Sequence, residues 1–485
     1  MLNDVLLEIF SKFLRQQYGS SLIIKGKPGA GKTTFALELL DSLRNEAPAY
    51  YITTRFSNDP LTDRFPWIND ISTGPKSRNR NVENLNDAFR EHLEKLERMI
   101  EEGKVSKNFG ATGTPGIVLN IEEILPELEA LYGFVSQNIN AKPVVVVDSI
   151  EAMAEKYDLD PEILFQTIQK DLVEKSGANI IMVMEQDRST SLDYYADGVV
   201  RMGFEYFNNF LIRTVTIEKL RGVSIGSSPI YLYSLDSGHF QSFKREQIIY
   251  PNQRIKKIAK AEDKQFEVSL GLREFSKLFP SGTDKVQLGS VIMVHRQTQS
   301  NVVDQYVNLF KNNIIKYSIG NGRGVLDVTS STYETSRVLV ATMEPDILKH
   351  YITAEKTEKS SPFIINIGGK SMSEDFPREV IDYYMTNSRK PLVYIFSTDF
   401  LKFTYGDNFV GDFSTIINNI RPTGVVIIVA DDEEYRKMYH YSTFSMHVND
   451  INGYVIFNSD SANMFLGSLS YDEEKWPDIK LSFVA

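Results

Sequence analysis

The sequence predicts an α/β protein in which mostly parallel sheets are covered by helices on both faces. Short apolar stretches alternate with amphipathic ones through the first half of the chain, as strands and helices do in such proteins. The run Val144–Val147 is entirely β-branched, which is typical of a central strand buried on both faces. The second half repeats the order of the first. The 485 residues, of which 42% are hydrophobic, suffice for two or three domains.

The elements of the first half follow from the spacing of apolar residues. Helical spacing predicts an opening helix over residues 2–16. The expected strands are the short apolar runs at residues 22–24, 50–53, 117–121, 144–147 and 180–184. The expected helices are residues 33–44, 81–102, 122–138 and 161–175, with a mobile loop at 109–116. Strands near residues 210–218 and 229–233 follow each other without a helix, which predicts an antiparallel extension at one edge.

We place the domain boundary at residues 251–264, between a first domain of residues 1–250 and a second of residues 265–485. The boundary stretch holds little to bury and four basic residues, namely Arg254, Lys256, Lys257 and Lys260. A basic cluster could contact phosphate, but we interpret it as a solvated linker.

The second half aligns with the first at three segments that keep their order and similar spacing. Residues 21–25 align with 290–294, 142–145 with 390–393, and 179–183 with 425–429, which favours a tandem duplication. The copies differ where chemistry would occur. Asp148 becomes Phe396, and the glycines and lysine of the first turn become His295, Thr298, Ser300 and Asn301. We therefore expect the second copy to keep the scaffold without binding nucleotide.

A glycine-rich turn between the first strand and the next helix fits the pattern G-x-x-x-x-G-K-[ST] of a phosphate-binding loop. Its residues are Gly26, Lys27, Pro28, Gly29, Ala30, Gly31, Lys32 and Thr33, followed by Thr34. Glycines let successive backbone N–H groups point at phosphate oxygens, and the helix adds its positive end. Lys32 would reach the β- and γ-phosphates, and the Thr33 hydroxyl is a hard oxygen ligand for Mg²⁺.

An acid follows the β-branched run, at Asp148. The carboxyl ends of parallel strands form the ligand face of such sheets. Asp148 is therefore our second candidate for holding Mg²⁺, through water.

These residues resemble the RecA superfamily, in its KaiC branch. The resemblance rests on the loop, on Val144–Ser149, and on three further segments, Asp197–Val200, Lys219–Gly222 and Leu232–Phe240. Tyr51–Arg55 and Phe65–Trp67 look most like archaeal ATPases grouped with the gas-vesicle regulator GvpD. The resemblance covers about residues 18–242. It implies a RecA-like P-loop NTPase domain that uses ATP and Mg²⁺, followed by a degenerate second RecA-like domain.

The resemblance also implies roles for two cations. In that family a K-x-R pair reaches the γ-phosphate held by the neighbouring subunit, so Lys219 and Arg221 would act in trans. A homo-oligomer is then expected, either a hexamer or, if the degenerate half caps assembly, a dimer. In a dimer the two cations would face the C-terminal copy instead of a second ATP.

One departure from the family concerns hydrolysis. KaiC-like proteins usually follow the second strand with one or two glutamates that activate water, whereas this chain has Arg55 and Phe56. An arginine cannot act as a general base, although Arg55 could hold a phosphate oxygen or a neighbour's acid. Glu185 is a possible substitute base, and it could equally be a sensor acid or a cap. We therefore expect tight binding of Mg-ATP, slow hydrolysis, and a regulatory switch acting on assembly or on a protein partner.

Two other function classes stay open: an active enzyme, either a DNA-dependent recombinase-like ATPase or an autokinase, and a scaffold that never hydrolyses ATP. Tyr194 and Tyr195 lie where related folds carry DNA-facing loops, but neighbouring acids favour a lid or seam loop. The net charge of −11 also argues against nucleic acid as the partner. The absence of cysteine excludes thiol and iron–sulfur chemistry. No apolar run is long enough to span a membrane and no signal peptide is evident, so we expect a cytoplasmic protein.

Overall fold

The computed structural model describes residues 4–53, 59–73, 126–156, 159–207, 209–226, 228–264, 266–357, 361–460 and 462–484. It divides into two compact units, Met1–Phe243 and Lys244–Ala485. The predictions for residues 81–102, 109–116 and 117–121 lie outside the described residues, and so does the start of the helix predicted at 122–138.

The described part of the first unit is built on a nine-stranded sheet in the order β3-β2-β4-β5-β1-β6-β7-β8-β9. Its strands are β1 (Ser21–Gly26), β2 (Ala49–Thr53), β3 (Ser72–Thr73), β4 (Val144–Asp148), β5 (Asn179–Val183), β6 (Gly198–Phe207), β7 (Phe210–Leu220), β8 (Ile230–Ser234) and β9 (Gln241–Ser242). The strands from β3 to β6 pair in parallel, and β6 to β9 pair antiparallel. The predicted parallel sheet with an antiparallel extension at one edge is therefore confirmed.

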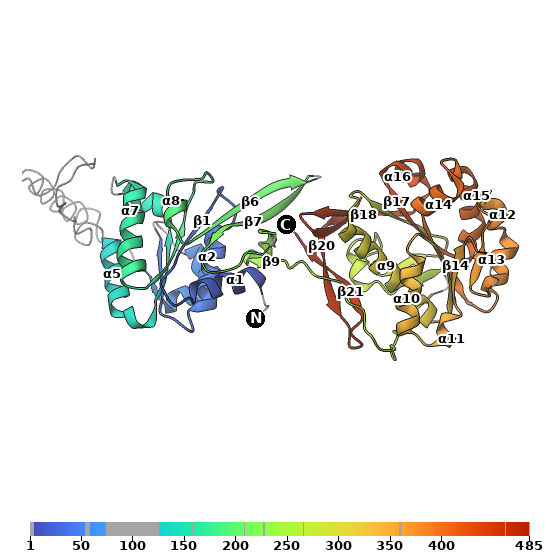
Figure 1. Ribbon diagram of the computed structural model, residues 1–485, viewed down its shortest axis with the longest axis horizontal. Coiled ribbons are helices and arrows are strands. Elements are labelled where there is room, and N and C mark those ends of the chain that lie inside the picture. Colours follow the sequence, from blue (N-terminus) through green and yellow to red (C-terminus); the bar gives the residue numbers. More distant parts are fainter. Residues whose placement is uncertain are drawn as a thin grey trace, which may run out of the picture. The chain divides into compact units, whose positions relative to one another are not determined.

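Helices cover both faces of this sheet (Figure 1). They are α1 (Val5–Leu14), α2 (Lys32–Leu43), α3 (Asp59–Arg64), α5 (Pro126–Gln137), α6 (Ile150–Lys156), α7 (Pro161–Ile168) and α8 (Leu192–Tyr195), with a π-helical turn over Gln169–Lys175 that continues α7. Short 3₁₀ turns lie at Pro66–Asp70, Ile139–Ala141 and Asp236–Gly238.

Strand β4 shows why the first unit has a hydrophobic core on each face of its sheet. Val144 and Val146 pack into the core beside α1 and α2, whereas Val145 and Val147 pack into the core beside α5, α6 and α7. Alternating side chains of one strand point to opposite faces, so an unbroken run of valines suits a strand that is buried on both.

The second unit carries a ten-stranded sheet in the order β15-β14-β13-β16-β17-β12-β18-β19-β20-β21, as far as its residues are described. Its strands are β12 (Val291–Arg296), β13 (Arg323–Val328), β14 (Tyr351–Glu355), β15 (Ile364–Asn366), β16 (Arg389–Ser397), β17 (Gly424–Asp431), β18 (Phe444–Ile451), β19 (Tyr454–Ser459), β20 (Ala462–Tyr471) and β21 (Pro477–Phe483). A separate hairpin is formed by β10 (Glu267–Ser269) and β11 (Lys285–Gln287).

Helices also lie on both faces of the second sheet (Figure 1). They are α9 (Asn301–Gly320), α10 (Thr332–Thr342), α11 (Pro345–Leu348), α12 (Met372–Asp375), α13 (Arg378–Met385), α14 (Thr398–Tyr405), α15 (Phe409–Ile420) and α16 (Asp432–Met438), with 3₁₀ turns at Arg273–Lys277, Arg421–Thr423 and Tyr439–Tyr441.

The strand orders of the two units correspond. Strand β12 lies between β17 and β18, as β1 lies between β5 and β6, and an antiparallel hairpin follows in each unit. The three aligned segments fall on β1 and β12, β4 and β16, and β5 and β17. Helix α9 begins at Asn301, the residue aligned with Lys32 at the start of α2. A second α/β domain with the topology of the first is therefore present.

The stretch that we interpreted as a solvated linker packs on the second unit. Ile255 is buried in the second unit's core, and its N–H donates to the carbonyl of Thr342. Asp263 forms an ion pair with the fully buried Arg323. The division between the units falls after Phe243, ahead of the expected boundary at residues 251–264. The composition did not reveal this, because one buried isoleucine and one acid paired with a buried arginine suffice to hold a polar segment.

No helix in the described ranges is long and apolar enough to cross a membrane.

Candidate phosphate-binding site

The turn between β1 and α2 has a backbone that two of its glycines make possible. Gly26 has φ 148°, and a Cβ there would lie 2.0 Å from the carbonyl oxygen of Met202 on β6. Gly31 has φ 80°, and a Cβ there would lie 2.6 Å from a methyl group of Leu235. The first glycine lets the loop leave the sheet against β6, and the second lets α2 begin in a left-handed conformation.

The N-terminus of α2 has no side-chain cap, because its N-cap residue is Gly31. In contrast, Asp4 caps α1 by accepting hydrogen bonds from the N–H groups of Leu6 and Leu7. The first N–H groups of a helix have no partner within the helix, and they carry its positive end. The chain therefore presents an uncapped helix start beside a glycine-rich loop, an arrangement that binds phosphate.

Lys32 is held inside this loop. Its Nζ donates to the carbonyls of Gly26 at 2.8 Å and Lys27 at 3.2 Å, and it pairs with Glu185 Oε2 at 2.9 Å. An ammonium has three protons, so these contacts occupy all of them. The Lys32 side chain is buried, whereas that of Glu185 is 47% exposed. The Glu185 carboxylate thus lies where an anionic ligand of Lys32 would bind.

The two residues expected to hold Mg²⁺ are adjacent. The Thr33 hydroxyl donates to Asp148 Oδ2 at 2.8 Å, and the Tyr51 hydroxyl lies 3.3 Å from the same oxygen. Hydroxyl and carboxylate oxygens are the hard ligands that Mg²⁺ prefers. Within the described residues no group of three or more His, Cys, Asp or Glu side chains could hold a metal ion. A magnesium ion here would therefore depend on phosphate oxygens and water for the rest of its shell.

Sequence reasoning missed three residues that support the loop. Glu151, on α6, accepts the N–H groups of Glu185 at 2.9 Å and Gln186 at 3.4 Å, and burial raises its pKa. Arg213 on β7 donates to the carbonyl of Gly29 at 3.2 Å. Tyr233 on β8 donates to the carbonyl of Ala30, and burial raises the pKa of its phenol. No motif marks Arg213, and Tyr233 lies in the segment Leu232–Phe240 that carried the resemblance but received no role there. Only the antiparallel extension of the sheet brings the two residues under the loop.

Lys219 and Arg221 lie far from the loop of their own unit. In the sheet, Lys219 pairs with Val199 of β6, and Val199 pairs with Ile23 of β1. Lys219 is therefore level with Ile23, which precedes Gly26 by three residues, or roughly 10 Å along β1 at the usual rise per residue. Arg221 lies further in the same direction, where its N–H donates to the carbonyl of Asp197. The structure therefore separates these two cations from Lys32, Thr33 and Asp148.

Both cations are bound to the segment around α8. Lys219 Nζ donates to the carbonyls of Asp193 and Tyr194, each at 3.0 Å, and Arg221 forms an ion pair with Asp197 at 2.9 Å. Burial, and then the neighbouring charge of Arg221, lower the pKa of Lys219. The last predicted site residue, Arg55, lies outside the described residues.

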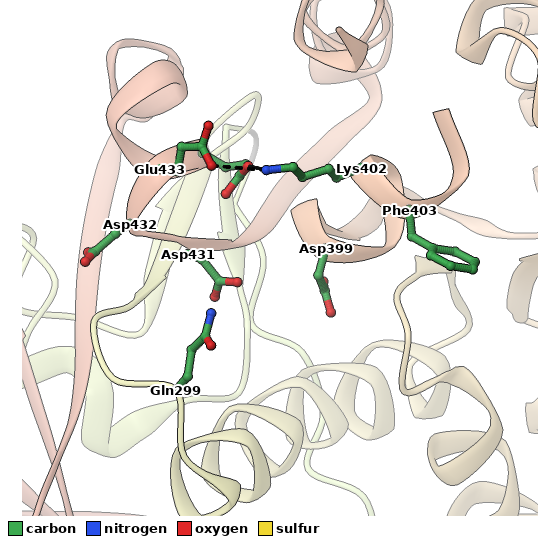
Figure 2. A pocket seen from close by; sticks show the side chains of 8 residues that line it. Gln299, Asp399, Lys402, Phe403, Asp431, Asp432 and Glu433 are labelled. Atoms are coloured by element: carbon green, nitrogen blue, oxygen red, sulfur yellow. Dashed lines mark hydrogen bonds and ion pairs between the residues drawn. The ribbon is translucent and has the colours of Figure 1, made fainter. Parts of the chain in front are cut away.

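The corresponding place in the second unit has opposite chemistry. Ser300 caps α9 by accepting the N–H of Val303, so the helix start is occupied by the chain itself. Arg296, aligned with Lys27, pairs with Asp304 at 3.0 Å and with Asp431 at 2.9 Å. Beside it lies a cavity of about 540 Å³ lined by Gln299, Asp399, Lys402, Phe403, Asp431, Asp432, Glu433 and Glu434. Figure 2 shows Asp399, Asp431 and Gln299 facing the same space. The negative charge there opposes phosphate binding.

Comparisons with known proteins agree with this geometry. Residues 10–218 match the family model described as the P-loop domain of the GvpD gas vesicle protein, and residues 300–484 match the one described as GvpD basic region 2. In this chain the second range carries more Asp and Glu than Lys and Arg.

Two curated relatives come from Halobacterium salinarum. Protein GvpD2 is 25% identical over 239 residues, which is 48% of this chain and 43% of that protein. Protein GvpD1 is 25% identical over 237 residues, or 48% of this chain and 39% of that protein. The matched region thus spans less than half the length of either relative. A solved KaiC-like protein from Pyrococcus horikoshii OT3 covers 47% of this chain and 90% of its own, at 20% identity and a TM-score of 0.32.

Proposed function

Because the chain belongs to the RecA-superfamily P-loop proteins of the KaiC/GvpD type, we propose that it is a slow ATP-dependent switch. Its first unit binds Mg-ATP, and the state of the nucleotide controls self-assembly or the binding of a regulatory protein partner. The observation that carries this proposal is the uncapped start of α2, with Lys32 on one side and the Thr33–Asp148 pair on the other.

Binding begins with an exchange of partners at Lys32. The β- and γ-phosphates replace the Glu185 carboxylate as the anionic partner of the ammonium, while the backbone N–H groups of the loop receive the remaining oxygens. Gly26 and Gly31 keep the backbone close enough for these contacts. Thr33 and Asp148 would hold Mg²⁺, whose positive charge stabilises the phosphates and the charge that develops when they are cleaved.

Hydrolysis then depends on Glu185. Once phosphate has displaced it from Lys32, its half-exposed carboxylate stands beside the γ-phosphate position, where it can orient or deprotonate water. The backbone N–H of Glu185 stays fixed by Glu151, so the side chain moves while its anchor does not. We expect turnover to be slow, because Arg55 and Phe56 stand where KaiC-like proteins usually carry the glutamates that activate water.

The position of Lys219 and Arg221 favours a role between subunits. Within one chain, the register of the sheet keeps the two cations away from the phosphate loop. The register sets no such distance to the loop of a neighbouring chain. In an oligomer they would bring positive charge to a γ-phosphate bound next door and respond to its loss.

The test is the nucleotide retained by the full chain after hours with Mg-ATP. Wild type is compared with Lys32→Ala and with Lys12→Ala, which removes an exposed lysine of α1. Retained ATP with slow phosphate release, lost in Lys32→Ala only, is the expected result. No nucleotide in any of the three proteins would refute ATP binding.

The same preparation separates the alternatives. Turnover that is stimulated by DNA would indicate a recombinase-like ATPase, and phosphate transferred to Ser or Thr would indicate an autokinase. Tight retention with no turnover at all would indicate a scaffold. Base preference is read by repeating the retention assay with Mg-GTP.

A further inference from the structure

Two buried histidines in the second unit lie where the first unit starts its phosphate loop. His295 on β12 is aligned with Gly26, and it pairs in register with His447 of β18, as Gly26 pairs with Met202. The two imidazoles are buried, and their Nδ1 atoms are 3.0 Å apart. This is the distance of an N–H···N hydrogen bond.

Each imidazole also contacts a carboxylate with its other nitrogen. His295 Nε2 lies 2.5 Å from Asp432 Oδ1, and His447 Nε2 lies 2.8 Å from Asp460 Oδ1. In Figure 2 the Asp432 side chain points away from Asp431 and Asp399. The four side chains therefore form one row: carboxylate, imidazole, imidazole, carboxylate.

The row fixes the number of protons. A carboxylate accepts, so each Nε2 carries a proton, and only one proton fits between the two facing Nδ1 atoms. Two imidazoles then share three ring protons, which makes one of them an imidazolium. With one proton fewer, two lone pairs would face each other or one carboxylate contact would be lost. With one proton more, two N–H groups would face each other.

The environment decides which ring is charged. Burial, opposed by Asp432 and then reinforced by the charge of His447, lowers the pKa of His295. The ring of His295 also stacks on Tyr435 at 4.0 Å between centroids. The lowered pKa favours His295 as the neutral acceptor of the row. The charged and titratable groups facing the pair are Asp432, Tyr435 and Arg436 from α16, Tyr439 behind them, and Asp460 beyond β19.

We infer that His295 and His447 form a single-proton site, which holds one positive charge between Asp432 and Asp460 and ties β12 and β18 to α16. A second proton opens the row. The break falls between the two Nδ1 atoms, where two N–H groups would then face each other.

The direction of the pH dependence follows from His295. Its pKa in the folded chain lies below the ordinary value of about 6.5. Its contribution to stability is therefore complete above that ordinary value, and is lost as the pH falls through the lower, folded-state value. For this group the second unit should loosen on the acid side.

The first experiment is a ¹⁵N NMR titration of the histidine rings in the full chain, which has six histidines. At pH 7 we expect one ring of the pair to be an imidazolium and the other to be protonated at Nε2 alone. In His447→Gln, loss of the neighbouring charge should raise the titration midpoint of His295 by about one pH unit. His440→Gln, which changes an exposed histidine, should leave it unmoved.

Three results would overturn the inference: two neutral rings at pH 7, an unchanged midpoint for His295 in His447→Gln, or a stoichiometric metal ion bound by both Nδ1 atoms after purification. If His447→Gln does not fold, Asp460→Asn replaces it, since the Asp460 side chain is 74% exposed. In that variant the imidazolium signal should disappear at a lower pH than in wild type, and an unchanged signal would also refute the site.

Discussion

At the scale of single residues, the contact between Lys32 and Glu185 links binding to hydrolysis. Glu185 competes with phosphate for Lys32 and is also the nearest candidate to activate water. Both roles favour a weak ion pair, since a stronger one would weaken nucleotide binding and also delay the attack on phosphate. The half-exposed Glu185 carboxylate suits both roles, because solvent on its side of the pair weakens the interaction with Lys32.

Glu185→Gln should therefore bind ATP more tightly and hydrolyse it more slowly. Loss of the competing charge should lower the Kd for ATP up to about fivefold, and loss of a general base should lower kcat by roughly a hundredfold or more. Nucleotide titration and phosphate release measure the two effects on one preparation. Glu174→Gln, an exposed acid of the π-helical turn, is the matched control. Tighter binding with unchanged kcat would leave Glu185 as a competitor only and assign water activation to another residue.

The residues of the phosphate loop could be picked out from the sequence, whereas most of the residues that support the loop could not. Lys32, Thr33 and Asp148 follow from a motif and from an acid at the end of a buried strand, and the structure brings Thr33 and Asp148 within hydrogen-bond distance. Glu151 lies three residues beyond Asp148, where its spacing offered a weak signal. Arg213 carried no signal, and Tyr233 lay in a segment of the resemblance without a predicted role, because their contacts depend on how the antiparallel strands fold back beneath the loop.

At the scale of elements, the starts of α2 and α9 explain why equivalent helices differ in chemistry. The helix after β1 begins at a glycine without a capping side chain, and the helix after β12 begins at a serine that caps it. Alignment predicted the substitution of Gly31 by Ser300. It did not predict the cavity lined by acids or the pairing of His295 with His447, which require the neighbouring strands to be in place.

Gly31→Ala tests the glycine start of α2. The left-handed φ of 80° and the contact with Leu235 should destabilise the first unit by about 1–3 kcal/mol and weaken nucleotide binding. Gly133→Ala, at an exposed helical position of α5 with open space around it, should instead stabilise by up to about 1 kcal/mol. Urea unfolding followed by circular dichroism gives both values, and hydrogen exchange assigns the change to α2. Equal effects of the two substitutions would contradict the assigned role of Gly31.

At the scale of the whole molecule, the chain pairs a unit built for phosphate with a unit whose equivalent place is negatively charged. The duplicated strand order was predictable, since apolar strands keep their spacing even when a site is lost. The place of the division after Phe243 was not, because single contacts such as those of Ile255 decide which unit a polar segment joins. The first unit also carries its phosphate loop and its Lys219–Arg221 pair at different levels of one sheet, so a single chain does not complete the proposed site.

Mixing two inactive variants tests whether that site is shared between chains. Lys32→Ala lacks a working loop but keeps Lys219 and Arg221, whereas the double variant Lys219→Ala, Arg221→Ala keeps the loop and lacks the cations. If the cations act in trans, the mixture should recover part of the ATP turnover that each variant lacks alone. Turnover would occur at the interfaces where the intact loop of one chain meets the intact cations of another. A mixture of Lys32→Ala with Lys32→Ala, Lys12→Ala has no working loop and should recover none. Turnover by the double variant at the wild-type rate would show that the two cations take no part in hydrolysis. An inactive mixture whose chains assemble together would mean that the cations act within their own chain, which would contradict the separation that the register of β1, β6 and β7 indicates.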